Sequence, residues 1–149
     1  MRRFMFWLVV SIWSSAMPGH TQELLDNGTV AQSWINEYRA KNGRSVLQVS
    51  QVLTKIAAQH AHDMSRHGFF SHTGSDGSSI SDRARDAGYQ FCIIAENIAK
   101  GQTSLGDVLN AWRNSKGHRQ NMLQSKAREF AVVQGAGDIW VMVIGSTVC

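Results

Sequence analysis

The chain has 149 residues, of which 43% are hydrophobic and 17% are charged, a composition typical of one globular domain rather than of a disordered segment. A single proline excludes proline-rich and collagen-like sequences, and two cysteines are too few for a small domain built around several disulfides. The formal net charge of +4 falls to +2 without Arg2 and Arg3, so the remaining chain has no basic excess of the kind that binds nucleic acid.

Residues 1–16 have the order of charge and hydrophobicity of a secretory signal peptide. Arg2 and Arg3 precede an apolar run from Phe4 to Trp13, and Ala16 ends a group of small residues. The run is shorter than the roughly 20 apolar residues of a transmembrane helix, so we expect no stable transmembrane anchor. Cleavage after Ala16 would release a secreted or periplasmic protein; an uncleaved amphipathic anchor is the alternative.

Residues 17–28 are polar and irregular, which predicts a flexible leader before a single domain over 29–149. A first helix is predicted from Thr29 to Gly43, and a second from a cap at Ser50 to Gly68. The second helix has a continuous apolar stripe made of Val52, Leu53, Ile56, Ala57, His60, Ala61 and Met64. This position predicts that His60 is a buried, hydrogen-bonded core residue.

The segment 69–79 is rich in turn-forming residues and predicts a loop. A short helix is expected from Ser79 or Ser81 to Gly88, followed by a buried strand over 91–95. Another helix begins after Thr103 or Ser104 and ends at Gly117, and a further turn covers 118–123.

Two strand-like runs, 130–133 and 139–144, flank a turn over 135–138 and predict an antiparallel hairpin. Helices therefore come first, one strand lies among them, and a hairpin ends the chain. This order predicts an α+β domain with a small sheet covered by helices.

The two cysteines are expected to be structural. In an exported protein a pair of cysteines is usually a disulfide, and a bridge from Cys92 to Cys149 would tie the C-terminal strand to the middle of the domain. In the chain-entropy model such a bridge stabilises the fold by roughly 4 kcal/mol. The alternatives are two free thiols, or pairing of Cys149 between chains.

Several polar side chains lie at the ends of predicted elements, where binding sites are usually built. They are His72, Glu96, Asn97, Ser115, His118, Arg119 and Asn121. Two imidazoles and one carboxylate, from His72, His118 and Glu96, could form a metal site or a general acid–base pair. Their spacing alone favours neither, because no two of them have local metal-ligand spacing.

Common catalytic signatures are absent from the sequence. There is no Gly-x-Ser-x-Gly elbow, no His-Glu-x-x-His pair and no glycine-rich phosphate loop. Glu96 also lacks an evident acidic partner of the kind that glycosidases need.

Three ordered motifs resemble the CAP superfamily of cysteine-rich secretory, antigen 5 and pathogenesis-related proteins. They are Phe70-Ser71-His72, Ala95-Glu96-Asn97-Ile98-Ala99-x-Gly101, and Trp112-x-x-Ser115-x-Gly117-His118-Arg119-x-Asn121-Met122-Leu123. The chain looks most like the short bacterial branch of SCP-like extracellular proteins, and the resemblance covers residues 31–146. It implies a three-layer α-β-α sandwich with a small central antiparallel sheet.

The resemblance also implies a cleft in which two histidines and two acids, in some members, bind a divalent metal such as zinc. His72, Glu96 and His118 match three of these positions, whereas Arg113, Asn114 and Ser115 supply no second acid. We therefore expect an exported, non-catalytic module that binds a small molecule, a lipid or an envelope component, with or without a metal. The alternatives are a peptidase-like hydrolase using the same three residues, and an envelope-interaction domain with a vestigial cleft.

Overall fold

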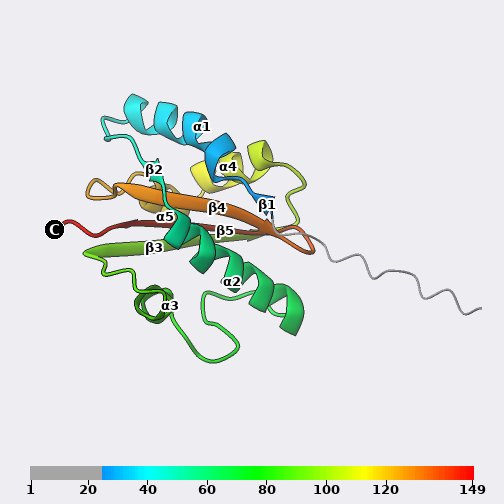
Figure 1. Ribbon diagram of the computed structural model, residues 1–149. Coiled ribbons are helices and arrows are strands. Elements are labelled where there is room, and N and C mark those ends of the chain that lie inside the picture. The colour runs from blue at the N-terminus through cyan, green and yellow to red at the C-terminus, as the bar shows by residue number, and fades with distance from the viewer. Residues whose placement is uncertain (1–24) are drawn as a thin grey trace, which may run out of the picture.

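A five-stranded sheet forms the middle layer of the computed structural model, which describes residues 25–149 (Figure 1). The strands are β1 (Leu25–Asp26), β2 (Gln48–Val49), β3 (Ile93–Lys100), β4 (Glu129–Gly135) and β5 (Ile139–Ser146). Antiparallel neighbours follow the order β1-β4-β5-β3, and β2 pairs in parallel with β4. The strand β3 therefore lies at an edge of the sheet.

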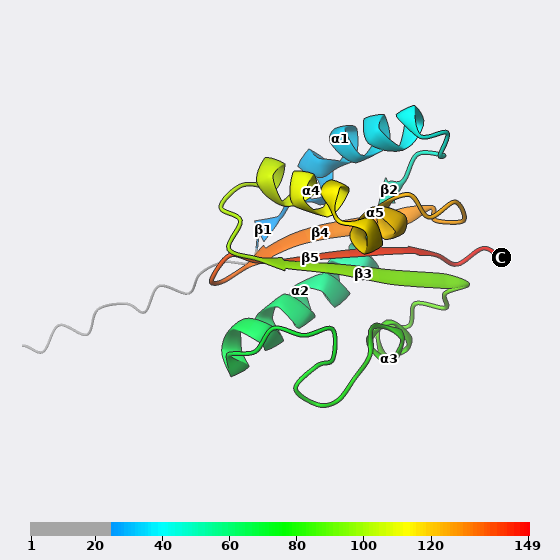
Figure 2. The same cartoon turned by 180° about the vertical axis from the view of Figure 1, so that it is seen from behind.

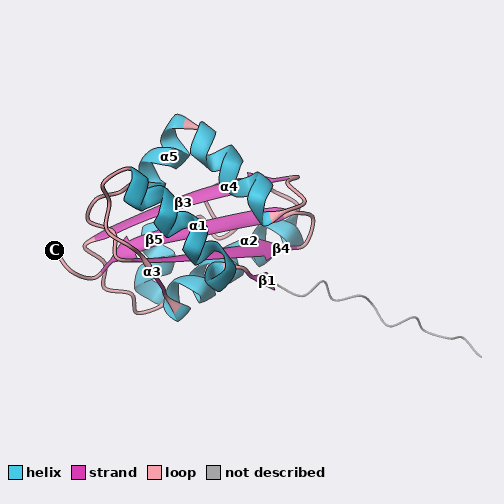
Figure 3. Cartoon of the chain, turned by 90° about the horizontal axis from the view of Figure 1, so that it is seen from above, coloured by secondary structure: helices cyan, strands magenta, loops and turns pink. Residues whose placement is uncertain are grey.

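Helices cover both faces of the sheet and confirm the predicted α+β, three-layer α-β-α sandwich (Figures 1 and 2). On one face lie α1 (Gly28–Lys41), α4 (Leu105–Asn114) and α5 (Lys116–Met122), seen from above in Figure 3. On the other face lie α2 (Gln51–His67) and α3 (Ile80–Asp86). A sheet that is apolar on both faces needs a helical layer on each.

The predicted hairpin supplies most of the apolar surface in the middle layer. Because side chains alternate along a strand, β4 and β5 each contribute to two cores. Phe130, Val132, Trp140 and Met142 pack in the core below α1 and α4, whereas Ala131, Val133, Val141 and Val143 pack in the core against α2. The predicted stripe of α2 is buried except for its first residue, Val52, which is 40% exposed.

Among the boundaries that differ from the sequence prediction, three concern the edge strand β3, the helices α4 and α5, and the start of the domain. The strand expected over 91–95 is β3 and continues to Lys100, because its pairing with β5 extends through Glu96 and Asn97. The helix expected to reach Gly117 ends at Asn114, where Ser115 adopts an extended backbone, and 116–122 form the separate helix α5. Residues 25–28, expected in the leader, form β1 and begin α1, because β1 pairs with β4.

The predicted disulfide joins Cys92 and Cys149, and the residues described contain no free cysteine. The two Cα atoms are 5.2 Å apart and 57 residues apart in sequence. Just beyond the bridge, the Cys92 N–H donates to the Ser146 carbonyl, which extends the pairing of β3 with β5. The bridge therefore holds the C-terminal end of the chain to the start of β3.

The predicted signal peptide over 1–16 and most of the predicted leader lie outside the described residues. Within residues 25–149, no helix is both long enough and apolar enough to cross a lipid bilayer.

Candidate functional site

Glu96 lies at the centre of the candidate site. It is in the middle of β3, and its side chain is 1% exposed on the face of the sheet covered by α2 and α3. Its Oε2 atom accepts a hydrogen bond of 2.7 Å from Arg83 Nη2, and its Oε1 atom accepts one of 2.8 Å from His72 Nδ1. Both oxygens of a buried carboxylate are thus engaged, as burial of a charge requires.

His72 comes from the loop between α2 and α3, and its side chain is 57% exposed. Because Nδ1–H donates to Glu96, the carboxylate fixes the orientation of the ring and leaves Nε2 free to contact a ligand. Arg83 also donates to the His72 carbonyl, at 3.2 Å from each terminal nitrogen. The Arg83 guanidinium therefore binds both the Glu96 carboxylate and the backbone of His72, whose ring Glu96 orients.

His60 is buried and hydrogen-bonded, as the stripe predicts, but it also borders the site. Its Nε2–H donates to the Ser71 carbonyl at 2.9 Å and lies 3.8 Å from Glu96 Oε1. Burial lowers the pKa of His60, and the nearby charge of Arg83 lowers it further, although Glu96 acts in the opposite direction. The ring is therefore neutral at pH 7, with a proton on Nε2.

Asn97, the residue after Glu96, faces the opposite side of the sheet and anchors α5. It is fully buried, and its Nδ2 donates to the His118 carbonyl at 3.1 Å. Asn121 Nδ2 completes the link by donating to Asn97 Oδ1 at 2.9 Å and to the Glu96 carbonyl at 3.2 Å. Asn97 and Asn121 therefore position the helix that carries His118.

These contacts also close part of the free edge of the sheet. The outward carbonyls of β3 at Glu96 and Ile98 accept hydrogen bonds from Asn121 Nδ2 and Trp112 Nε1. An edge whose polar groups are already satisfied is a poor template for an added strand. Ligands at this edge would therefore meet side chains rather than open backbone.

His118 lies on α5, which is on the opposite face of the sheet from α2 and α3, and its side chain is partly buried. Burial lowers its pKa, and the charge that His72 carries when protonated lowers it further. His118 is therefore neutral at pH 7. His72 is close enough for its charge to act on His118, so the two rings approach the same edge of the sheet from its two faces, and we refer to His72, Glu96 and His118 at this edge as the histidine site.

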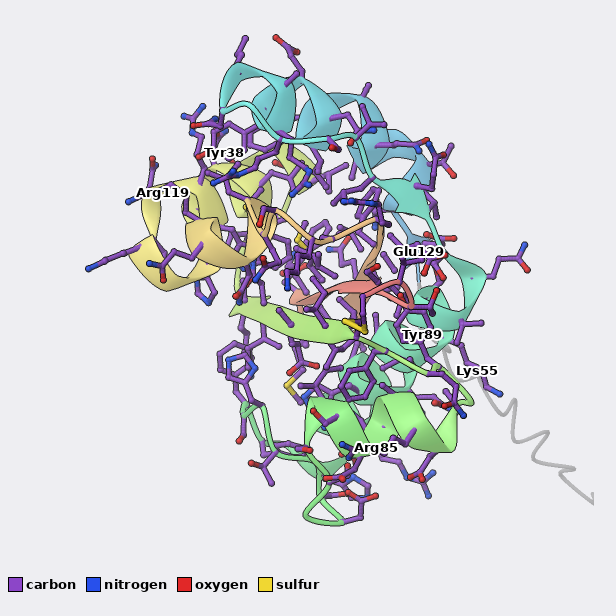
Figure 4. All side chains as sticks on the ribbon, turned by 90° about the vertical axis from the view of Figure 1, so that its left-hand side faces the viewer. Tyr38, Lys55, Arg85, Tyr89, Arg119 and Glu129 are labelled. Atoms are coloured by element: carbon purple, nitrogen blue, oxygen red, sulfur yellow. A yellow bond between two sulfur atoms is a disulfide. The ribbon has the colours of Figure 1, made fainter. Side chains whose placement is uncertain are left out.

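Ser115 and Arg119, also predicted as cleft residues, are located at the junction of α4 and α5. Ser115 separates the two helices, and Arg119 donates to the Arg113 carbonyl at 3.1 Å. Figure 4 places Arg119 on the side of α5 away from the strands. No contact in the described residues joins either side chain to His72, Glu96 or His118.

Arg83 is the residue of the site that sequence reasoning missed. Its side chain is 11% exposed and pairs with Glu96 across 13 residues of sequence. It lies in the middle of α3, and nothing local to that short helix indicates a partner on β3.

The side chains do not fit a divalent metal. No group of three or more His, Cys, Asp and Glu side chains within residues 25–149 is arranged to hold one. The two oxygens of Glu96 accept hydrogen bonds from Arg83 and His72. Because the Arg83 cation already neutralises this carboxylate, Glu96 is not available as the expected metal ligand. The set of His72, Glu96 and His118 is thus not assembled as metal ligands.

Comparison with known proteins gives consistent matches. The model of the cysteine-rich secretory protein (CAP) family matches residues 32–142. Two Bacillus subtilis proteins are similar: the uncharacterised protein YkwD is 35% identical over 106 residues, and the uncharacterised membrane protein YlbC is 32% identical over 90 residues. These alignments cover 70% and 60% of this chain, but only 41% and 26% of the relatives, so the chain spans less than half of their length.

Solved structures share the fold. An extracellular protein with an SCP domain from Bacillus anthracis has a TM-score of 0.74 at 24% identity, covering 80% of this chain and 40% of that one. An outer surface protein of Borrelia burgdorferi has a TM-score of 0.73 at 23% identity, covering 84% of this chain and 98% of that one. At these identities the likeness concerns the fold alone.

Proposed function

Because the chain belongs to the cysteine-rich secretory protein family, we propose that it is an exported domain that binds a ligand at the histidine site without catalysing a reaction. In this proposal residues 1–16 are a signal peptide, and the domain begins near the start of β1. The Cys92–Cys149 disulfide supports export, since disulfides persist mainly in oxidising compartments.

The state of Glu96 carries the proposal. Its carboxylate is buried, paired with Arg83 and hydrogen-bonded to His72, so its role is to hold an imidazole in place. Neither of its oxygens is available to bind a metal or to take a proton from a substrate. The histidine site instead offers the free Nε2 of His72 and the neutral ring of His118.

Imidazole rings of this kind exchange hydrogen bonds with hydroxyl and amide groups and present flat faces to apolar atoms. These properties suit a small molecule or a lipid head group that carries hydroxyl groups. Asn97 and Asn121 support such binding, because they fix α5 and therefore the position of His118.

The proposal is tested by recording the histidine ring resonances of the purified protein during titration with dihexanoylphosphatidylglycerol, whose head group carries two hydroxyls. We expect saturable shifts of the His72 and His118 signals, and loss of binding in a His72→Ala/His118→Ala variant. A His62→Ala variant is the matched control, since that exposed ring lies elsewhere on α2. Absence of saturable shifts would favour a vestigial cleft.

Zinc titration by calorimetry separates the metal-dependent form of the proposal from the metal-free one. We expect no binding at micromolar concentrations, because Arg83 occupies the carboxylate. Micromolar binding that disappears in the double alanine variant would show that the two rings recruit a metal without Glu96.

One observation favours a hydrolase as a second candidate. A carboxylate that orients Nδ1 of a histidine is the arrangement of general-base catalysis, in which Nε2 takes a proton from water or a hydroxyl. Hydrolysis of a peptide or ester, abolished by Glu96→Gln, would establish it. The pairing of Glu96 with Arg83 counts against it, because the guanidinium weakens the support that the carboxylate gives to an imidazolium.

A further inference from the structure

Positive charge is concentrated in two segments of the chain. Residues 39–44 and 113–128 together contain eight Arg and Lys residues and no Asp or Glu. By contrast, residues 51–96, which include α2 and α3, contain four Arg and Lys residues and five Asp and Glu residues. The small net charge of the whole chain therefore hides a separation of charge between its parts.

The two basic segments meet where α1 and α5 end. Arg39, which is buried near the end of α1, donates to the carbonyls of Met122 at 2.7 Å and Gln124 at 3.1 Å. Arg44, from the first segment, and Arg119, from the second, line one cavity of about 280 Å³. The two segments thus form one continuous surface, which we call the basic face.

The cations of the basic face have almost no carboxylate partners. In the part of the chain that the structure describes, Lys41 is the one cation of the eight that forms an ion pair, with Glu37. Glu129 directly follows Arg128, but its side chain is on the other face of the sheet and accepts a hydrogen bond of 2.6 Å from Tyr89. Figure 4 shows Glu129 beside Tyr89 and away from the basic face. The remaining cations are therefore free to meet an external anion.

The arginines of the basic face are close enough to repel one another. The pKa of Arg39 is lowered to about 10, first by burial and then by the charges of Arg44 and Arg128. The side chain of Arg44 has no hydrogen-bond partner in the described chain, and that of Arg119 donates to the Arg113 carbonyl at 3.1 Å. A bound anion would offset this repulsion, and the planar guanidinium group matches pairs of phosphate oxygens.

The cavity contains only part of this positive charge. It is lined by two Arg, two Gln, one Ser and one Leu side chain, and no carboxylate faces it. Its volume takes one small group such as a phosphate. Lys116, Lys126 and Arg128 lie outside the cavity and are exposed. A chain of repeated anions can contact the cations inside and outside the cavity together, which a single small anion cannot do.

We propose that the basic face binds a linear polymer of the cell envelope that carries a phosphate group on each repeating unit. One phosphate would accept hydrogen bonds from Arg44 and Arg119 in the cavity, and its neighbours along the polymer would lie against the exposed cations outside it. The proposal relies on export of the chain but not on ligand binding at the histidine site.

Two other polyanionic partners fit the basic face less well. A bilayer surface needs apolar side chains to insert, and among the described residues Val46 is the one large apolar residue exposed beside the arginines. A nucleic acid binds more tightly where its bases stack on aromatic rings, and no aromatic ring lines the cavity.

The test is calorimetric titration of the purified exported protein with long-chain inorganic polyphosphate. We expect saturable binding that weakens about tenfold or more when NaCl is raised from about 50 to about 200 mM, because neutralising the phosphates of a polymer releases counterions. At the same concentration of phosphate groups, inorganic phosphate should bind at least about tenfold more weakly, because it cannot reach the cations outside the cavity.

Variants locate the surface. Arg44→Gln/Arg119→Gln should weaken polyphosphate binding about tenfold or more. The variant keeps the fold, since the two side chains together contribute one hydrogen bond to it. Lys55→Gln/Arg66→Gln is the matched control: it removes the same charge from exposed positions on α2 and should change the affinity by less than about twofold.

Several outcomes would overturn the proposal. They are the absence of saturable binding, equal losses in the two double variants, and binding of inorganic phosphate as tight as that of the polymer. Tighter binding to phosphatidylglycerol vesicles or to oligodeoxythymidylate than to polyphosphate would assign the basic face to a membrane or to a nucleic acid instead.

Discussion

Removal of the Arg83 guanidinium tests whether a buried ion pair holds Glu96. The side chains are 11% and 1% exposed, and their charged atoms lie 2.7 Å apart. In Arg83→Met the carboxylate stays buried with His72 as its remaining hydrogen-bond donor, and the Ser78 carbonyl loses its contact with Arg83. Breaking a buried pair costs about 3–5 kcal/mol, so we expect the free energy of unfolding to fall by that amount.

The assay is urea unfolding followed by tryptophan fluorescence. With a slope of about 2 kcal/mol per molar urea, the midpoint of Arg83→Met should fall by roughly 1.5–2.5 M. Glu96→Gln and the double variant complete a cycle, and we expect a coupling energy of about 1–3 kcal/mol between the two side chains. The double variant should therefore lose less stability than the two single changes predict together.

Arg85→Met is the matched control on the same helix. The Arg85 side chain is 64% exposed, 3.3 Å from Asp82 and stacked over Phe91 at 5.3 Å. Its removal should cost less than about 1 kcal/mol. Equal losses in Arg83→Met and Arg85→Met, or a coupling energy of zero, would refute the conclusion that Arg83 neutralises Glu96.

Three further predictions concern the rest of the domain. Replacing both Cys92 and Cys149 by serine should lower the free energy of unfolding by about 4 kcal/mol, measured in urea, whereas an unchanged midpoint would mean that the bridge adds no constraint. Because the pKa of His118 in the folded state is below its ordinary value of 6.5, the unfolded chain binds more protons there, so this residue lowers stability as pH falls from 6.5 towards the folded-state pKa. Histidine resonances recorded against pH would contradict this if His118 titrated at or above 6.5. Gly145→Ala should cost about 1–3 kcal/mol, because its Cβ would lie 2.9 Å from the Tyr89 hydroxyl oxygen, and thermal unfolding equal to that of the native chain would show that Tyr89 moves aside.

The extent of β3 was mispredicted for a physical reason. Sequence reasoning ended the strand at Ala95, where the apolar run ends, whereas the pairing continues through Glu96 opposite Val143 and Asn97 opposite Met142. Polar side chains can occupy a buried strand when other elements supply their hydrogen bonds, as Arg83 does for Glu96. Those partners are distant in sequence, so no local pattern indicates them.

The candidate site was predicted in part. The motifs singled out His72, Glu96, Asn97, His118 and Asn121, and hydrogen bonds now connect His72 to Glu96 and Asn121 to Asn97. Whether they bind a ligand is still a prediction. The same motifs contain Ser115 and Arg119, which make other contacts, because adjacent residues of a short helix point in different directions.

The sequence by itself predicted an α+β domain and favoured a disulfide between its two cysteines, and its resemblance to the CAP superfamily predicted the three layers. The apolar stripe of α2 and the alternation of apolar side chains in the hairpin indicate which side chains must be buried. This information is local, because it depends only on the period of the backbone. The tertiary structure alone decided that Arg83 pairs with Glu96, that His60 borders the same carboxylate, and that Glu96 and Asn97 face opposite sides of the sheet. These contacts depend on which segments, distant in sequence, pack against the edge strand β3. The free energy that stabilises this packing comes from burial and hydrogen bonding between elements rather than within them.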